Sequence, residues 1–174
     1  MLRSIVPLIL ATATPALASP SGLSVNPWWE KITVTMSHDG QAQGCRYETS
    51  TASAAAKDCT VVGASAAAAA PSAKDQYATI TFERRFNPGS APPTESAMVA
   101  GDKLLGRQVM SLAIDGAGKV SGCKVVAATG DTGLTYGCED VATEHFATSA
   151  QATAATGRQG FMTILVYGHT EHVV

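Results

Sequence analysis

The architecture of the whole chain can be inferred from one stretch, which begins RQVMSLAIDGAGKVSGCKVVAATG (residues 107–130) and ends FMTILVY (residues 161–167). Apolar residues alternate with small or polar ones over residues 109–114, as in a strand with one buried face. The DGAG that follows favours a tight turn, because Asp and Gly tolerate left-handed backbone. Residues 120–128 then predict the return strand, and residues 161–167 predict a last strand that closes the unit.

A helix is predicted between these strands, over residues 137–150. Glu139 and Asp140 lie in its first turn, where the helix dipole favours negative charge. One side of this helix would carry six residues at helical spacing, namely Cys138, Val141, Ala142, His145, Phe146 and Ser149. The unit is therefore expected to run strand, turn, strand, helix, strand.

The first 18 residues have the pattern of a secretory signal peptide. Arg3 is followed by the apolar run of residues 5–10, and the segment ends in Ala16-Leu17-Ala18, which suits cleavage before Ser19. The alternative is an uncleaved anchor, but the run is far shorter than the ~20 residues that span a bilayer. We expect a periplasmic or secreted protein with no membrane span in its mature part.

The composition excludes some partners. The formal net charge is −2, and no basic stripe is present, so nucleic acid and anionic lipid are poor candidates. Aromatic residues make up only 6% of the chain, which predicts a thin core. The mature part is long enough for one domain of ordinary size or two very small ones.

Four cysteines can reinforce such a core, because an even number in an exported protein indicates disulfides. Three pairings are possible, and the sequential one is preferred: Cys45 with Cys59, and Cys123 with Cys138. Each bridge would stabilise the fold by roughly 3 kcal/mol if it acts on the unfolded chain. Zinc is the alternative, but no two cysteines have the close spacing that zinc sites use.

The first half of the chain repeats the order of parts seen in the second half. A strand is predicted at residues 31–36, a turn at 37–40, a return strand at 41–49 and a further strand at 77–86. The matches are Asp39-Gly40 with Asp115-Gly116, Gly44-Cys45-Arg46 with Gly122-Cys123-Lys124, Cys59 with Cys138, and Thr79 to Phe82 with Thr163 to Val166. A tandem duplication explains these matches, and chance similarity among Thr- and Ala-rich strands is the alternative.

The predicted fold class is α+β, with two tandem ββαβ units, each an antiparallel sheet with a helix on one face. The units span residues 19–86 and 107–174. The linker at 87–106 starts with a segment rich in Pro and Gly and could hold a short helix at 94–105. The helix of the first unit would fall in the alanine-rich region of residues 50–73.

The second unit resembles the C-terminal domain of TonB, the periplasmic end of an energy transducer that engages outer-membrane receptors. The resemblance lies in residues 109–120 (VMSLAIDGAGKV), residues 123–130 (CKVVAATG) and Leu134. Cys123 and Cys138 look like a variant in which the return strand is bridged to the helix. The chain departs from TonB in having a cleavable signal in place of a membrane helix, only a short linker, and no Tyr-Pro segment before Arg107.

The resemblance implies a role in envelope transport through β-augmentation, in which a receptor segment adds beside the last strand. The matching positions are Thr163, Ile164, Leu165, Val166 and Tyr167, with Thr79 to Phe82 in the first unit. We expect a non-enzymatic module that binds a protein or extended peptide, such as an outer-membrane receptor. The alternative is a scaffold, monomeric or homodimeric, whose two last strands pair with each other. A metal-dependent envelope enzyme is a third reading.

Other candidate residues point to ordinary structural roles. His169 and His172 could bind a metal only if the C-terminal tail bends. His38 is expected in a solvated turn and His145 in helix packing. Trp28-Trp29 suits a core plug better than a ligand platform, and Glu83-Arg84-Arg85 suits a solvated strand end. No Gly-x-Ser-x-Gly or phosphate-binding loop is present, so neither a catalytic residue nor a cofactor is expected.

Overall fold

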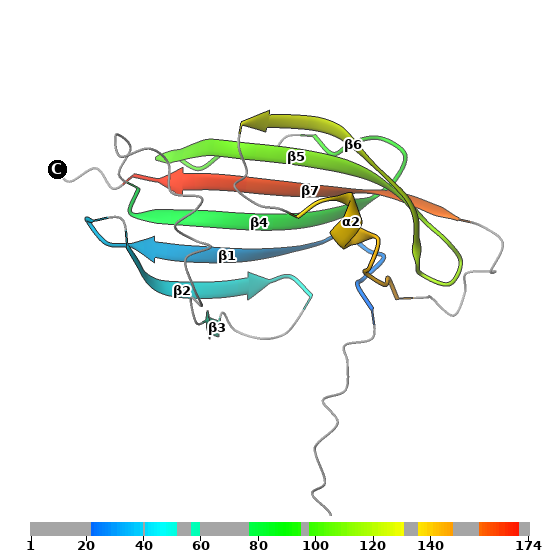
Figure 1. The fold of residues 1–174 in the computed structure, drawn as a ribbon, viewed down its shortest axis with the longest axis horizontal. Helices are drawn as coiled ribbons and strands as arrows, with labels where there is room; N and C mark the ends of the chain where they lie inside the picture. The colour runs from blue at the N-terminus through cyan, green and yellow to red at the C-terminus, as the bar shows by residue number, and fades with distance from the viewer. Residues whose placement is uncertain are drawn as a thin grey trace, which may run out of the picture.

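The computed structural model describes residues 22–39, 41–51, 57–59, 77–94, 98–130, 136–147 and 157–170. The predicted signal peptide and the alanine-rich region around residues 60–76 lie outside these ranges. Within them the chain forms seven strands and one short helix (Figure 1). The elements are β1 Trp28–Met36, β2 Ala42–Thr49, β3 Lys57–Cys59, β4 Thr79–Pro88, β5 Asp102–Ile114, β6 Val120–Gly130, α2 Cys138–Val141 and β7 Arg158–His169.

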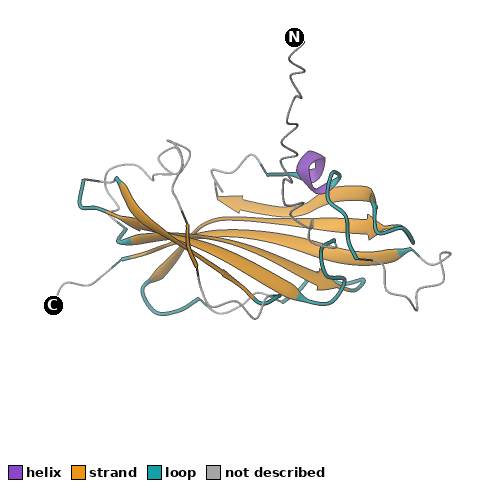
Figure 2. Ribbon diagram, turned by 90° about the horizontal axis from the view of Figure 1, so that it is seen from below, coloured by secondary structure: helices purple, strands orange, loops and turns teal. Residues whose placement is uncertain are grey.

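All seven strands belong to one antiparallel sheet, in the order β3-β2-β1-β4-β7-β5-β6. The helix α2 has only four residues and lies against one side of this sheet (Figure 2). The α+β prediction, with a helix packed on a sheet, is therefore wrong, because the described part of the chain is almost entirely antiparallel β-structure. No helix among the described residues is long and apolar enough to cross a membrane.

The predicted helix at 137–150 ends early because the backbone after α2 bonds to other segments. Phe146 donates its N–H to the carbonyl of Gly118 at 2.7 Å, and Leu23 donates to the carbonyl of His145 at 2.6 Å. These bonds take groups that a longer helix would have used internally. Val141 and Phe146 are nevertheless buried, so the apolar spacing correctly predicted that both belong to the core. The backbone between them is a turn followed by extended chain, not a helix.

The two hairpins have the same construction. Val34 faces Cys45 in the first, and Leu112 faces Cys123 in the second, at the same separation along the chain. In each turn, the side chain of the first turn residue accepts a hydrogen bond from the backbone N–H of the residue four positions later. Ser37 Oγ accepts from Gln41 at 3.0 Å, and Asp115 Oδ1 accepts from Lys119 at 2.9 Å. Ser37 therefore takes the position of Asp115, which the sequence match had given to Asp39.

The last strands also differ from the sequence match. Val34 pairs with Ile80 in β4, and Leu112 pairs with Gly160 in β7, so Ile80 corresponds to Gly160. The sequence match of residues 79–82 with 163–166 therefore lies two strand periods further along β7 than the correspondence in the structure. The sequence match and the structural match both put the same residues of the strand on its inner face, because side chains in a strand alternate. The pattern of apolar residues therefore could not distinguish the two alignments.

The two halves join where the whole length of β4 pairs with β7, from Thr79↔His169 to Pro88↔Gly160. The predicted linker at 87–106 is shorter in the structure, because β4 continues to Pro88 and β5 starts at Asp102. The helix predicted over 94–105 is wrong at residues 102–105, which belong to β5.

One side of the sheet, called here the core face, carries the main hydrophobic cluster under α2. Phe86 is central to it, with ring centroids 4.8 Å from Phe146 and 6.3 Å from Trp28. The buried members of the cluster are Trp28, Phe86, Met110, Leu112, Ile114, Val120, Val141, Phe146, Met162 and Ile164. The opposite side of the same strands is called the cleft face, and it carries the polar residues described below.

Candidate functional site

The predicted binding strand, β7, lies inside the sheet. Thr163 pairs with Arg85 of β4 on one side and with Val109 of β5 on the other, and Tyr167 is likewise paired on both sides. The matching segment of the first unit, residues 79–82, lies between β1 and β7. Strand addition beside Thr163, Ile164, Leu165, Val166 and Tyr167 is therefore not compatible with this pairing, because no backbone edge is open there.

The long open edge of the sheet is β6 (Figure 1), whose outer side has no strand partner among the described residues. Residues 124–130 are all exposed, including Val125 (45%) and Val126 (46%). From residue 125 to 130 the sequence VVAATG carries no charge. An exposed, apolar and uncharged edge offers unpaired N–H and C=O groups to another chain. The opposite edge strand, β3, has only three residues.

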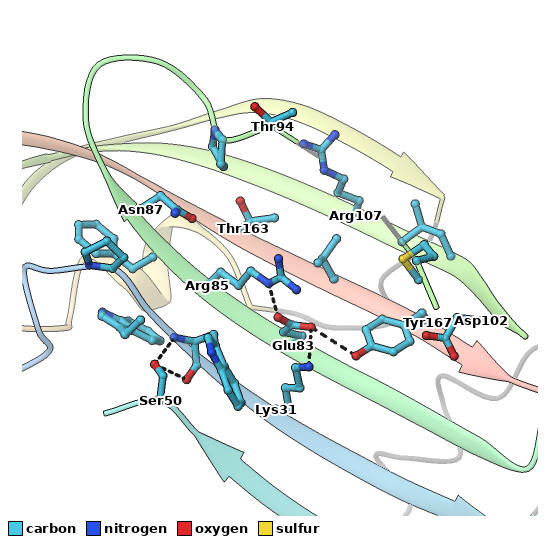
Figure 3. Close-up of a pocket in the computed structure, with 18 of the residues that line it drawn as sticks. Lys31, Ser50, Glu83, Arg85, Asn87, Thr94, Asp102, Arg107, Thr163 and Tyr167 are labelled. Carbon is cyan, nitrogen blue, oxygen red and sulfur yellow. Dashed lines mark hydrogen bonds and ion pairs between the residues drawn. The ribbon is translucent and has the colours of Figure 1, made fainter. Parts of the chain in front are cut away.

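A cleft of about 600 Å³ lies on the cleft face, next to the chain that connects β4 to β5 (Figure 3). This volume is within the range of small-molecule sites, which is about 300–1,000 Å³. Its walls mix apolar and charged side chains. The apolar ones include Trp29, Met98, Val99, Leu104 and Leu165, and the charged ones are Lys31, Glu83, Arg85, Asp102 and Arg107.

Glu83 organises the floor of this cleft. Its side chain is only 1% exposed. One carboxylate oxygen pairs with Arg85 Nε, and the other lies 3.7 Å from Lys31 Nζ and accepts the Tyr167 hydroxyl at 3.3 Å (Figure 3). A buried carboxylate needs such partners, and in return it holds both cations at the cleft wall.

Tyr167 gives the cleft a testable pH dependence. Burial, followed by the negative charge of Glu83, raises the pKa of Tyr167 to about 12, above its usual value near 10. The folded protein thus holds this proton where the unfolded chain has lost it, so the contribution to stability is complete below pH 10 and disappears as the pH rises to 12.

We therefore expect the urea midpoint of wild type to fall between pH 10 and pH 12, and the midpoint of Tyr167→Phe to fall less over the same interval. Burial also raises the pKa of Tyr136, so Tyr136→Phe should reduce a separate part of this dependence. An identical alkaline slope in wild type and Tyr167→Phe would contradict the expectation.

Thr163 and Arg107 complete the cleft wall through their strand positions. Thr163 lies directly opposite Arg85, and Arg107 pairs with Leu165, two residues from Thr163. Thr163 is 5% exposed, and its hydroxyl oxygen is buried without a hydrogen-bond partner. Buried hydroxyls are normally bonded, so this unpaired hydroxyl is unusual.

Arg84, between Glu83 and Arg85, points to the core face and forms a second polar network. Its Nε donates to Glu30 at 2.6 Å, and its Nη1 donates to Tyr136 at 2.7 Å and to Glu144. Its guanidinium carbon lies 5.1 Å from the Trp28 ring centroid. Burial lowers the pKa of Arg84, but the charges around it outweigh this effect and raise the pKa overall.

The expectation that Glu83-Arg84-Arg85 is a solvated strand end is wrong. The triplet lies in the middle of the sheet and serves both faces, because alternate residues of a strand point to opposite sides. The sequence did contain a signal that the triplet lies within a strand, because the three charged residues stand between the apolar residues Phe82 and Phe86.

The cysteine pairing is as predicted, with bridges Cys45–Cys59 and Cys123–Cys138. The first joins β2 to β3, and the second joins β6 to α2. Disulfides of this kind are compatible with a periplasmic or extracellular location.

The histidines do not form a common site in the described part of the chain. His169 Nδ1 lies 2.9 Å from Asp102 Oδ1, whereas His38 and His145 are exposed. His145 was expected in helix packing, and its exposure corrects that expectation. Within the described ranges no group of three or more His, Cys, Asp or Glu could hold a metal, and His172 lies outside those ranges.

The tryptophan pair divides between the two faces. Trp28 is buried in the core cluster (4% exposed), which agrees with the prediction of a core plug. Trp29 points to the cleft face and lines the cleft with Lys31, whose Nζ lies 4.9 Å from its ring centroid.

A scan against models of protein families, a search of curated proteins and a search of solved structures each gave no match to this chain.

Proposed function

We propose that this chain is an exported, non-enzymatic binding module that takes up an extended peptide segment of a protein partner along the free edge of β6. The observation that carries the proposal is the outer side of residues 124–130, which is exposed and has no strand partner in the part of the chain that the structure describes, with Val125 and Val126 available for contact. Main-chain bonds would supply affinity, and the two valines would supply preference for apolar residues in the partner.

The location is the periplasm or the extracellular space, after cleavage near Ala18. The leader-like sequence of residues 1–18 supports this proposal, and the two disulfides are compatible with it. The resemblance to TonB C-terminal domains suggests an outer-membrane receptor as the partner. The point of attachment would differ from that of TonB, because β7 is already paired.

The test uses residues 19–174 as bait for a library of random ten-residue peptides. Three forms are compared: wild type, Val126→Lys, and the matched control Val99→Lys, which places the same charge at a loop valine that is 71% exposed. A charge on an edge strand discourages pairing. We expect Val126→Lys to weaken peptide binding by about tenfold or more, and Val99→Lys to leave it unchanged.

Hydrogen exchange then locates the bound peptide. The expected result is slower exchange at backbone amides of residues 124–130 in the wild-type complex. Equal binding by Val126→Lys and Val99→Lys, or protection only outside β6, would overturn the proposal. Circular dichroism of each variant establishes that it is folded.

A second candidate function is supported by the pairing of β4 with β7. This pairing covers an edge of each half and suits a scaffold, in which β6 could join β6 of a second copy. Sedimentation of wild type and Val126→Lys distinguishes the two functions. Dimerisation that Val126→Lys abolishes, without any peptide binding, would favour the scaffold.

A further inference from the structure

The cleft on the cleft face is a second site, separate from the β6 edge. We infer that this cleft binds a neutral, largely apolar small molecule, which covers Met98, Val99 and Leu104 at one end and the ring of Trp29 at the other. Its volume of about 600 Å³ is that of a site for a drug-sized ligand. This inference goes beyond the peptide-binding function and does not depend on it.

Exposed apolar side chains gather at one end of the cleft. The part of the chain that the structure describes has six exposed large hydrophobic residues, and three of them line this cleft: Val99 (71%), Leu104 (42%) and Met98 (39%). All three lie just before β5 or at its start. An apolar ligand would cover these side chains, and the release of water from them favours binding.

Apolar surface continues along the floor to the opposite end of the cleft. Leu165 and Tyr167 alternate on β7 with buried residues, and both line the cleft with partly exposed side chains. Trp29 belongs to β1, which is separated from Leu104 of β5 by β4 and β7. A ligand that spans these strands can therefore bury apolar surface at both ends of the cleft.

The charged residues of the wall favour a neutral ligand, because each of them already has a partner in the protein. The printed contacts join Glu83 to Lys31 and Arg85, and Asp102 to His169 (Figure 3). Arg107 is also engaged in an interaction within the protein. An ionic group on the ligand would lose its hydration and would have to compete with these contacts, whereas a neutral ligand avoids both costs.

The test compares three biphenyl compounds that share the same rings and differ in charge. Biphenyl-4-methanol is neutral, biphenyl-4-carboxylate is negative and biphenyl-4-methylammonium is positive. Titration calorimetry measures the binding of each to the folded chain of residues 19–174. We expect biphenyl-4-methanol to bind saturably, and each ion to bind at least about tenfold more weakly. If biphenyl-4-methanol does not bind saturably, or if either ion binds as tightly, the inference is wrong.

One pair of substitutions assigns the binding to the cleft. Leu104→Gln should weaken biphenyl-4-methanol by about fivefold or more, because the ligand then covers less apolar surface. Ile32→Gln is the matched control, since Ile32 is 41% exposed, nearly as much as Leu104, but alternates on β1 with the cleft residue Lys31 and so lies on the core face. Ile32→Gln should leave the affinity unchanged, and equal affinities of the two variants would overturn the inference.

Met98→Gln tests the same end of the cleft outside the strands. Met98 precedes β5 and is exposed, so its replacement should leave the circular dichroism spectrum unchanged while the affinity for biphenyl-4-methanol falls several-fold. Val126→Lys, which is designed to block the β6 edge, should bind biphenyl-4-methanol like wild type. Weaker binding by Val126→Lys, together with unchanged binding by Met98→Gln, would place the ligand at the β6 edge and contradict the inference.

Discussion

Replacing Phe86 by alanine is expected to lower the free energy of unfolding by about 4 kcal/mol, the largest effect of any single substitution considered for this protein. Phe86 is 1% exposed, and its ring contacts those of Trp28 and Phe146. It also fills the space above Gly160, where an added Cβ would lie 2.5 Å from the ring. Its loss would leave a cavity in the middle of the core cluster, because the paired strands cannot close around it.

Urea denaturation followed by tryptophan fluorescence measures this effect. Phe82→Ala is the matched control, because Phe82 is on the same strand and face but is only partly buried, in a smaller cluster. The same change there should cost clearly less, since less apolar surface is lost. Equal losses of stability for Phe82→Ala and Phe86→Ala would contradict the assigned core.

Arg84→Met is expected to cost about 3 kcal/mol of stability, because it leaves two carboxylates without their shared cation. The Arg84 side chain is 20% exposed, and it joins Glu30 of β1 to Glu144 after α2. One oxygen of Glu144 is already buried without a partner. Loss of Arg84 would therefore raise the electrostatic cost of keeping Glu144 against the sheet.

A matched control exists at Arg46, which pairs with Glu48 but is 62% exposed. Arg46→Met should change stability by less than about 0.5 kcal/mol, since exposed ion pairs contribute little. Adding Glu30→Gln and Glu144→Gln to Arg84→Met should restore part of the loss by removing the unpaired charges. If Arg84→Met is as stable as Arg46→Met, the network on the core face does not hold α2 to the sheet.

Local patterns in the sequence were sufficient to find most of the strands. Alternation identified the core of β1, β4 and β5, and the Gly- and Asp-containing turns identified both hairpins. The cysteine pairing was also predicted correctly, because each bridge closes a short segment between neighbouring elements. These features depend on residues close in the chain, whose geometry the sequence determines directly.

The helix at 137–150 could not be judged from its own sequence. Its apolar residues do have helical spacing, but backbone hydrogen bonds to distant segments hold the chain beyond Val141. Leu23 donates to the carbonyl of His145, and Phe146 donates to the carbonyl of Gly118. Tertiary hydrogen bonds replaced the helical ones at little net cost, since each backbone group remains paired.

The candidate sites were decided by tertiary structure. The sequence predicted a strand at residues 161–167, but only the pairing of β7 with β4 and β5 shows that both its edges are covered. The same pairing brings Arg85, Thr163 and Arg107 together from three strands, although they are far apart in sequence. A strand's own sequence determines which side chains share a face, whereas its neighbours are chosen by hydrogen bonds across the whole sheet; the open edge of β6 and the cleft both result from that choice.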